Sequence, residues 1–262
     1  MPISKGNLHE DEMIEFLNEK QVKTLSNNLR NMVIELFGVV DPEETIQCEH
    51  AIEYTKPDFV VTYKGKQKYV SMKSGNGELV HHETIDTFFK FLESLGVSNE
   101  TITTLKLNQF GDGTIDGTGT KRYELSELKY ALRDRIKRAN FELNQVEIIL
   151  KVADRVLFQG VNPDVPAANA IYHGTFEYGV MANKKQIMKY INAKKARWDF
   201  YDNLHIGPFF IRPHARYINT EIKSEKSRRM IDLHWPRMRS DIEFISKHYD
   251  SYTPIRFRTY EE

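Results

Sequence analysis

Two short β-prone runs joined by a turn occupy residues 57–73, and this pattern restricts the fold more than any other in the chain. The runs at 59–63 and 68–72 are typical of strands, and the few residues between them are typical of a tight turn. The strands of such a hairpin run antiparallel, so Asp58 before the first and Lys73 after the second should lie close together. The sequence therefore predicts a carboxylate and an ammonium at one end of a sheet.

The composition indicates an ordinary globular protein. A length of 262 residues allows one large domain or two smaller ones, and a hydrophobic content of 40% can fill a core in either case. The only cysteine is Cys48, so no intramolecular disulfide can form, and no Cys/His set has zinc-ligand spacing. The N-terminus is acidic, and no apolar run approaches the roughly 20 residues of a membrane span. We therefore expect a soluble, cytoplasmic protein without a membrane partner.

The net charge of zero conceals a difference between the two halves of the chain. Residues 1–119 carry 11 Lys and Arg against 19 Asp and Glu, whereas residues 120–262 carry 26 against 18. This difference suggests a polyanion-binding surface joined to a carboxylate-bearing site, because phosphate contacts come mainly from Lys and Arg. The alternative is that both sets of charges are solvated faces.

Apolar residues recur every three or four positions in several segments and predict helices there. The first predicted helix is long, at 11–37, and ends before Gly38. A glycine-rich stretch at 108–121 predicts a loop, and 160–168, with two prolines, predicts a linker. Further helices are predicted at 83–95, 126–143, 145–158, 184–193 and 240–248, and further strands at 171–181, 204–211 and 230–234.

The Pro-Asp pair, the hairpin and the lysine that closes its second strand resemble the PD-(D/E)XK nuclease superfamily, which has the restriction-endonuclease-like fold. The matched part, residues 11–95, is about a third of the chain. The resemblance implies an α/β or α+β core in which helices flank a mixed central sheet. By motif position it implies that Asp58 binds Mg²⁺, or Mn²⁺ in its place, and that Lys73 positions or activates the attacking water. Mg²⁺ prefers oxygen ligands and retains several waters, so one or two carboxylates suffice.

The chain departs from this family at Ser71, where an Asp or Glu usually stands two residues before the lysine. A serine hydroxyl cannot replace that charge. A subgroup of restriction enzymes that cut CCGG-like sites also has Ser-X-Lys and takes the missing acid from the following helix. The resemblance therefore implies a metal-binding glutamate there, with Glu83 the first candidate and Glu78 the second. Glu35 is the third, because a carboxylate on the first helix often supplements the site in this superfamily.

Each of these residues also has a structural interpretation. Asp58 could be a turn residue after a proline, Lys73 a solvated strand end, and Glu83 an acid favoured by the dipole at a helix N-terminus. His81 and His82 suggest metal ligands, but adjacent residues point in different directions. Surface or half-buried histidines are the simpler interpretation.

The second half of the chain interleaves aromatic and basic residues, as at 197–201 and 209–217, and adds a basic run at 223–229. Such segments can neutralise phosphates and reach base edges, although the aromatic residues could also be core. We expect this part to bind or specify the target. The candidate DNA-binding residues of the whole chain are Ser71, Asn76, Arg212, Arg216, Lys226, Arg228 and Arg229.

Together these patterns predict a Mg²⁺-dependent DNA endonuclease of restriction type, with residues 1–160 as catalytic core and 161–262 as a basic α+β part. Asp58 and Glu83 would hold the metal, and Lys73 would stabilise the developing charge. By analogy with the family we expect a homodimer on double-stranded DNA, and the resemblance leaves room for a cognate DNA methyltransferase in the cell. The alternatives are a non-catalytic nucleic-acid-binding protein on a nuclease-like scaffold, and an α/β protein that acts through other partners.

Overall fold

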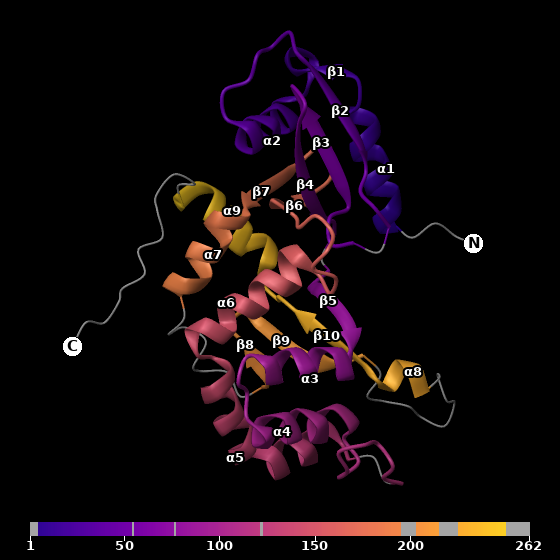
Figure 1. Cartoon of the computed structure of the whole chain (residues 1–262), viewed down its shortest axis with the longest axis vertical. Helices are drawn as coiled ribbons and strands as arrows, with labels where there is room; N and C mark the ends of the chain where they lie inside the picture. Colours follow the sequence, from indigo (N-terminus) through magenta and orange to yellow (C-terminus); the bar gives the residue numbers. More distant parts are fainter. Residues whose placement is uncertain are drawn as a thin grey trace, which may run out of the picture. The chain divides into compact units, whose positions relative to one another are not determined.

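The computed structural model describes residues 5–53, 55–75, 77–120, 123–194, 203–214 and 225–249. Over these residues the protein is mixed α+β, with helices flanking a mixed sheet, as predicted. The chain divides into two compact units, each with one β-sheet (Figure 1). The first unit comprises residues 1–77, 157–193 and 237–262, and the second comprises residues 78–156 and 194–236.

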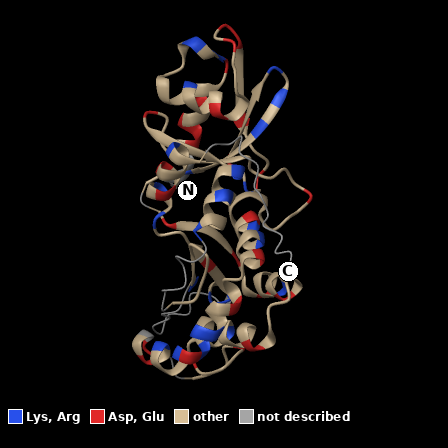
Figure 2. Cartoon of the chain, turned by 90° about the vertical axis from the view of Figure 1, so that its left-hand side faces the viewer, with Lys and Arg blue, Asp and Glu red and all other residues tan. Residues whose placement is uncertain are grey.

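This division differs from the predicted one at residue 160, because the chain passes between the units four times. The predicted linker at 160–168 instead lies within the first unit, between η2 (Arg155–Gln159), whose residues from Leu157 on belong to that unit, and β6 (Ala170–Gly174). The first unit carries 17 Lys and Arg against 19 Asp and Glu, and the second 20 against 18. Both signs are accordingly interspersed along the ribbon (Figure 2). The acidic and basic halves of the sequence are therefore not two oppositely charged units.

The first unit contains a six-stranded mixed sheet with the order β1-β2-β3-β4-β6-β7. Neighbouring strands are antiparallel except for β4 and β6, which run parallel. The other strands of this sheet are β1 (Lys20–Gln21), β2 (Thr45–His50), β3 (Phe59–Tyr63), β4 (Lys66–Lys73) and β7 (Gly179–Asn183).

The predicted hairpin is β3 and β4. Tyr63 pairs with Lys66, so the turn consists of two residues only, Lys64 and Gly65. Both have positive φ angles, 48° and 73°, as the tight turn that matches strand twist requires. The second strand consequently begins two residues earlier than predicted.

The predicted helix at 11–37 is interrupted. It consists of α1 (Lys5–Leu17) and α2 (Asn27–Phe37), separated by β1 and the short η1 (Val22–Thr24). Ser26 begins α2, because its Oγ accepts a hydrogen bond from the Leu29 amide at 3.3 Å. Val22 and Leu25 within the break are buried in the same core as both helices. The apolar spacing therefore continues through a segment that is not helical.

The core of the first unit lies against one face of the sheet. Met13 and Leu17 from α1 and Leu29 and Val33 from α2 are buried there with inward-facing strand residues such as Val61. The remaining helices of this unit, α7 (Lys184–Ala193) and α9 (Met238–His248), pack against β7.

The second unit contains a four-stranded antiparallel sheet with the order β5-β10-β9-β8. The helix predicted from residue 83 begins at residue 85, because Thr84 caps it, and Glu83 belongs to the preceding strand. No described helix is both long and apolar enough to cross a membrane. The strands are β5 (Leu79–Thr84), β10 (Met230–His234), β9 (Phe209–Pro213) and β8 (His205–Ile206), and the helices are α3 (Ile85–Ser94), α4 (Asn99–Phe110), α5 (Leu125–Leu143), α6 (Val146–Asp154) and α8 (Glu225–Arg228).

Candidate active site

Asp58 and Lys73 lie at the same end of the first unit's sheet, as the hairpin predicts. Asp58 immediately precedes β3 and Lys73 ends β4, and the two strands are antiparallel. The Asp58 amide donates to the Val70 carbonyl at 2.9 Å, and its own carbonyl accepts from the Ala51 amide at 3.1 Å. The backbone of Asp58 is therefore fixed on both sides.

The side chain of Asp58 is held by only one of its carboxylate oxygens. Oδ2 accepts hydrogen bonds from the Met72 amide at 2.5 Å and from Ser71 Oγ at 3.2 Å. No hydrogen bond from a described residue reaches Oδ1. Ser71 itself is 1% exposed, so its hydroxyl positions Asp58 and is not placed on a surface that DNA could contact. This arrangement leaves one oxygen of a positioned carboxylate available to a cation.

A second carboxylate, which the sequence reasoning missed, belongs to Glu10 on α1. Burial raises the pKa of Glu10, the Asp58 carboxylate raises it further, and the Lys73 ammonium opposes both effects. Charges affect one another in this way only when they are near in space. Glu10 therefore lies within electrostatic range of Asp58 and Lys73, and we call these three residues of the first unit the charged cluster.

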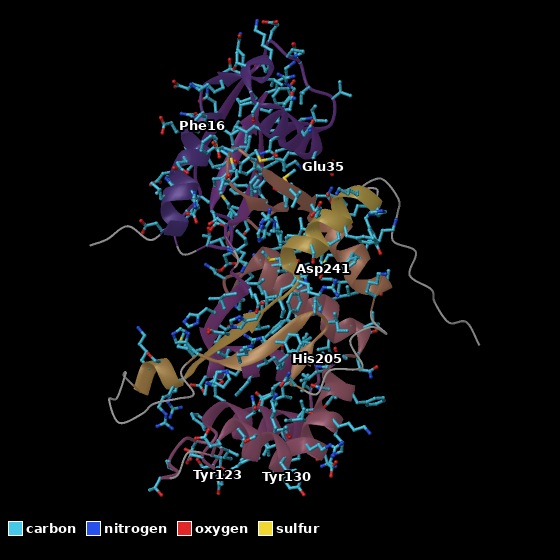
Figure 3. All side chains as sticks on the ribbon, turned by 180° about the vertical axis from the view of Figure 1, so that it is seen from behind. Phe16, Glu35, Tyr123, Tyr130, His205 and Asp241 are labelled. Carbon is cyan, nitrogen blue, oxygen red and sulfur yellow. The ribbon has the colours of Figure 1, made fainter. Side chains whose placement is uncertain are left out.

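The packing of α1 explains how Glu10 reaches this end of the sheet. The helix packs against β2, and its buried Met13 and Leu17 follow Glu10 by three and seven residues. Residues at this spacing share one side of a helix. Phe16 of the same helix stacks on Phe176, with ring centroids 3.9 Å apart (Figure 3). In the sequence, the sign of this position is that Glu10 continues the apolar side of the helix formed by Met13 and Leu17.

His173 lies beside Lys73, because β6 is parallel to β4 and the two residues are paired in register. It is 4% exposed, and its buried Nδ1 has no hydrogen-bond partner among the described residues. Burial lowers the pKa of His173, and Arg239 and Lys73 lower it further. A neutral imidazole therefore stands next to the lysine.

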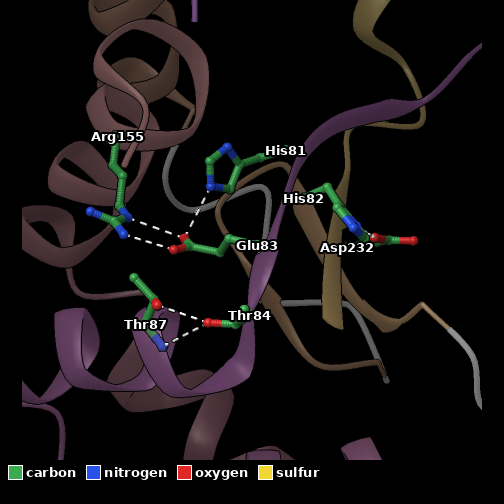
Figure 4. A network of polar contacts seen from close by, with 7 residues as sticks. All are labelled: His81, His82, Glu83, Thr84, Thr87, Arg155 and Asp232. Atoms are coloured by element: carbon green, nitrogen blue, oxygen red, sulfur yellow. Dashed lines mark hydrogen bonds and ion pairs between the residues drawn. The ribbon is translucent and has the colours of Figure 1, made fainter. Parts of the chain in front are cut away.

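Glu83, the first candidate for the missing acid, lies on β5 in the second unit and already has three hydrogen-bond donors (Figure 4). Its carboxylate accepts from Arg155 at 2.7 and 3.1 Å and lies 3.0 Å from the Nε2 atom of His81. Burial alone would raise the pKa of Glu83, but the bonds from His81 and Arg155 outweigh this effect and lower it. These contacts favour a structural role for Glu83.

The other two predicted glutamates also have partners outside the cluster. Glu35 on α2 (Figure 3) accepts a hydrogen bond from the Asn183 side chain at 3.0 Å. Asn183 belongs to β7, which is three strands from β3, or roughly 14 Å at about 4.8 Å per strand. Glu78 precedes β5 in the second unit and lies 3.8 Å from Arg212.

The predicted DNA-binding residues have different environments. Arg212 and Lys226 are exposed, whereas the side chain of Arg228 is only 16% exposed. Arg228 donates to the Gly117 carbonyl at 3.0 Å and lies 3.6 Å from Asp112, so it anchors the loop after α4. Its guanidinium and that of the half-buried Arg229 both lie 5.9 Å from the centroid of the Phe110 ring. Asn76 and Arg216 lie outside the described residues.

Helix α5 carries a row of exposed basic residues that the sequence analysis did not predict as DNA-binding. Lys129, Arg133 and Lys137 follow one another at four-residue spacing and are all exposed, as is Tyr130 (Figure 3). Residues four apart lie on one side of a helix, so these three basic side chains form a row, the α5 basic stripe.

No protein-family model matches the chain, and no curated protein matches it. The interpretation of the site therefore rests on its residues and their geometry.

Proposed function

We propose that the first unit is a metal-dependent phosphodiesterase of the PD-(D/E)XK type in which Glu10 supplies the carboxylate absent at Ser71. Two observations support this proposal: Asp58 and Lys73 lie at one end of the sheet, and both charges act on the pKa of Glu10. The two carboxylates and the ammonium come from α1, from the residue before β3 and from the end of β4. The helix-flanked mixed sheet agrees with the architecture that the resemblance implies.

The donor atoms of this cluster suit a divalent cation with a preference for oxygen. Asp58 Oδ1 is open, and the Glu10 carboxylate is destabilised by its acidic neighbour, an effect that a bound cation would reverse. Asp58 and Glu10 would therefore hold Mg²⁺ or Mn²⁺, with water and phosphate oxygens as further ligands. When bound, such an ion lowers the pKa of a coordinated water and polarises the phosphate.

The protein residues have separate tasks in this proposal. Ser71 and the Met72 amide hold Asp58 Oδ2, which would leave Oδ1 to bind the cation. Lys73 carries a positive charge that would stabilise the negative charge developing on the phosphate during in-line attack by water. Burial lowers the pKa of His173, and its neutral form would not compete with a cation for the two carboxylates.

The second unit would bind double-stranded DNA through the α5 basic stripe, together with Arg212 and Lys226. These side chains are exposed, as phosphate contacts require. A single cluster per chain cuts one strand at a time, so cleavage of both strands at one site would involve two chains as a homodimer.

The test is cleavage of supercoiled plasmid and short duplexes with Mg²⁺ or Mn²⁺. We expect wild-type protein to cleave, and D58A, K73A and E10Q to lose at least about 100-fold in rate. E35Q and E78Q serve as matched controls and should cleave like the wild type. Wild-type protein that binds duplex DNA in a salt-dependent way but cleaves none would refute the proposal and favour a non-catalytic binding protein.

Metal binding gives a second readout that does not depend on activity. Calorimetric titration with Mn²⁺ should show a binding event in the wild type that is weakened in both E10Q and D58A but unchanged in E83Q. Mn²⁺ binding by E10Q as tight as by the wild type would show that Glu10 is not a ligand. Loss of binding in E83Q alone would restore the glutamate that the family resemblance implies.

A further inference from the structure

Two histidines and one aspartate meet on the sheet of the second unit, far from one another in the sequence. Asp232 in β10 pairs in register with His82 in β5, and His214 follows the last residue of β9. The Nδ1 atom of His82 lies 2.5 Å from Asp232 Oδ1, and that of His214 lies 3.0 Å from Asp232 Oδ2. Figure 4 shows His82 directed at Asp232, whereas His81, its neighbour in the strand, is directed at Glu83.

The atoms that could ligate a metal are close enough to share one ion. One nitrogen from each histidine and one carboxylate oxygen all lie within 4.8 Å of one another. The two imidazole rings approach edge to face, with centroids 4.6 Å apart. A third imidazole nitrogen, His234 Nε2, lies 3.9 Å from Asp232 Oδ2, next to these three side chains.

Among the described residues, the partners of Asp232 are histidines, which carry no permanent charge. Its side chain is 11% exposed, and a buried carboxylate normally requires a cation or several hydrogen-bond donors. Within the part of the chain that the structure describes, no Lys or Arg lies within ion-pair distance of it. Arg212, which is paired opposite in β9, lies instead 3.8 Å from Glu78. A bound dication would supply the missing charge.

We propose that His82, His214 and Asp232 bind a transition-metal dication, with Zn²⁺ the best fit. Two imidazoles and one carboxylate are a donor set that zinc and its neighbours in the first transition series accept, whereas Mg²⁺ prefers oxygen ligands only. Three protein ligands leave a coordination position open. The side chains of His82 and His214 are 38% and 45% exposed, so water or a solute has access to that position. The ion would also join β5, β10 and the end of β9.

This inference is separate from the proposed nuclease site, because all three ligands belong to the second unit and are of a different chemical kind. The site also differs from a sequence motif of fixed spacing, since its ligands come from β5, from β10 and from the residue after β9, which folding brings together.

The test is calorimetric titration of the full-length chain with Zn²⁺ after chelator treatment, in millimolar Mg²⁺ to occupy oxygen-rich sites. We expect one equivalent of Zn²⁺ per wild-type chain and binding at least about tenfold weaker in H82A and in H214A. H50A is the matched control, because His50 is exposed and paired with Asp11 at 3.0 Å in the first unit. D58A should bind Zn²⁺ like the wild type, which separates this site from the nuclease site.

Further measurements distinguish the loss of a metal ligand from misfolding of a variant. Co²⁺ in place of Zn²⁺ should give a visible absorption spectrum that H214A lacks, and Zn²⁺ should raise the melting temperature of wild type but not of H214A. Circular dichroism identical to wild type would show that H214A is folded. Absence of stoichiometric Zn²⁺ binding by the wild type, or equal binding by wild type, H82A and H214A, would overturn the proposal.

Discussion

Replacing Glu83 with glutamine tests whether this carboxylate has a structural or a catalytic role. The side chains of Glu83 and Arg155 are 3% and 14% exposed and lie 2.7 Å apart. Loss of one member of a buried ion pair leaves an uncompensated charge, which costs roughly 3 to 5 kcal/mol. Glutamine keeps the shape of the side chain and one acceptor oxygen. We therefore expect E83Q to lower the free energy of unfolding by about 3 kcal/mol, the lower end of that range.

Urea unfolding, monitored by tryptophan fluorescence, measures this loss of stability in the second unit. Both tryptophans of the chain belong to the second unit, as Glu83 does, and Trp235 is 1% exposed. With a denaturant slope of about 2 kcal/mol per molar, the midpoint of that unit should fall by roughly 1.5 M.

The matched variant is E10Q, which should show the opposite pattern. Because burial and Asp58 disfavour the charged form of Glu10, its neutralisation should leave the unfolding midpoint unchanged or slightly raised while abolishing metal-dependent cleavage. E83Q should in turn retain cleavage at a urea concentration where it is still folded. An E83Q protein with the wild-type midpoint and no activity would refute this reasoning.

Three further predictions concern other residues. The stability that Glu83 contributes should be fully present above its ordinary pKa of 4.5 and should be lost as the pH falls through its lowered folded pKa. Acid unfolding of E83Q, monitored by fluorescence, should not show this pH-dependent loss of stability. Burial raises the pKa of Cys48 to about 12, so a thiol reagent at pH 8 should label it only when the first unit unfolds; rapid labelling in native buffer would contradict this. R228A should destabilise the second unit by about 1 to 3 kcal/mol through loss of its bond to Gly117, whereas K226A should leave the urea midpoint unchanged; equal midpoints would count against an anchoring role.

Local patterns predicted much of the secondary structure. The helix at 184–193 and the strand at 230–234 are confirmed at their predicted bounds, because their signals lie wholly within the segments. The predicted helix at 11–37 was wrong in its middle, because Val22 and Leu25 keep the helical spacing of buried residues while the chain turns. The predicted strand at 171–181 is a hairpin of two strands, joined by a turn that the apolar pattern spans.

The hairpin half of the candidate site was predictable, and its completion was not. Asp58 and Lys73 are brought together by neighbouring strands and a two-residue turn, so the relevant interactions are local. Glu10 arrives only because α1 ends at Leu17 and packs on β2, which is nearly 40 residues away in the sequence. Glu83 was expected at a helix start, but Thr84 is the capping residue, so Glu83 falls in the preceding strand.

The parallel contact between β4 and β6 has a consequence for the order in which the protein folds. These neighbours are separated by almost 100 residues, most of them in the other unit, and the last helix of the first unit begins only at residue 238. During synthesis the second unit cannot finish folding before β10 has left the ribosome, and the first unit cannot finish before α9 has. Contacts between such distant segments slow folding and leave partly folded chains with exposed strand edges. We therefore expect slow refolding, dependence on chaperones during expression, and no stable fragment that ends before α9.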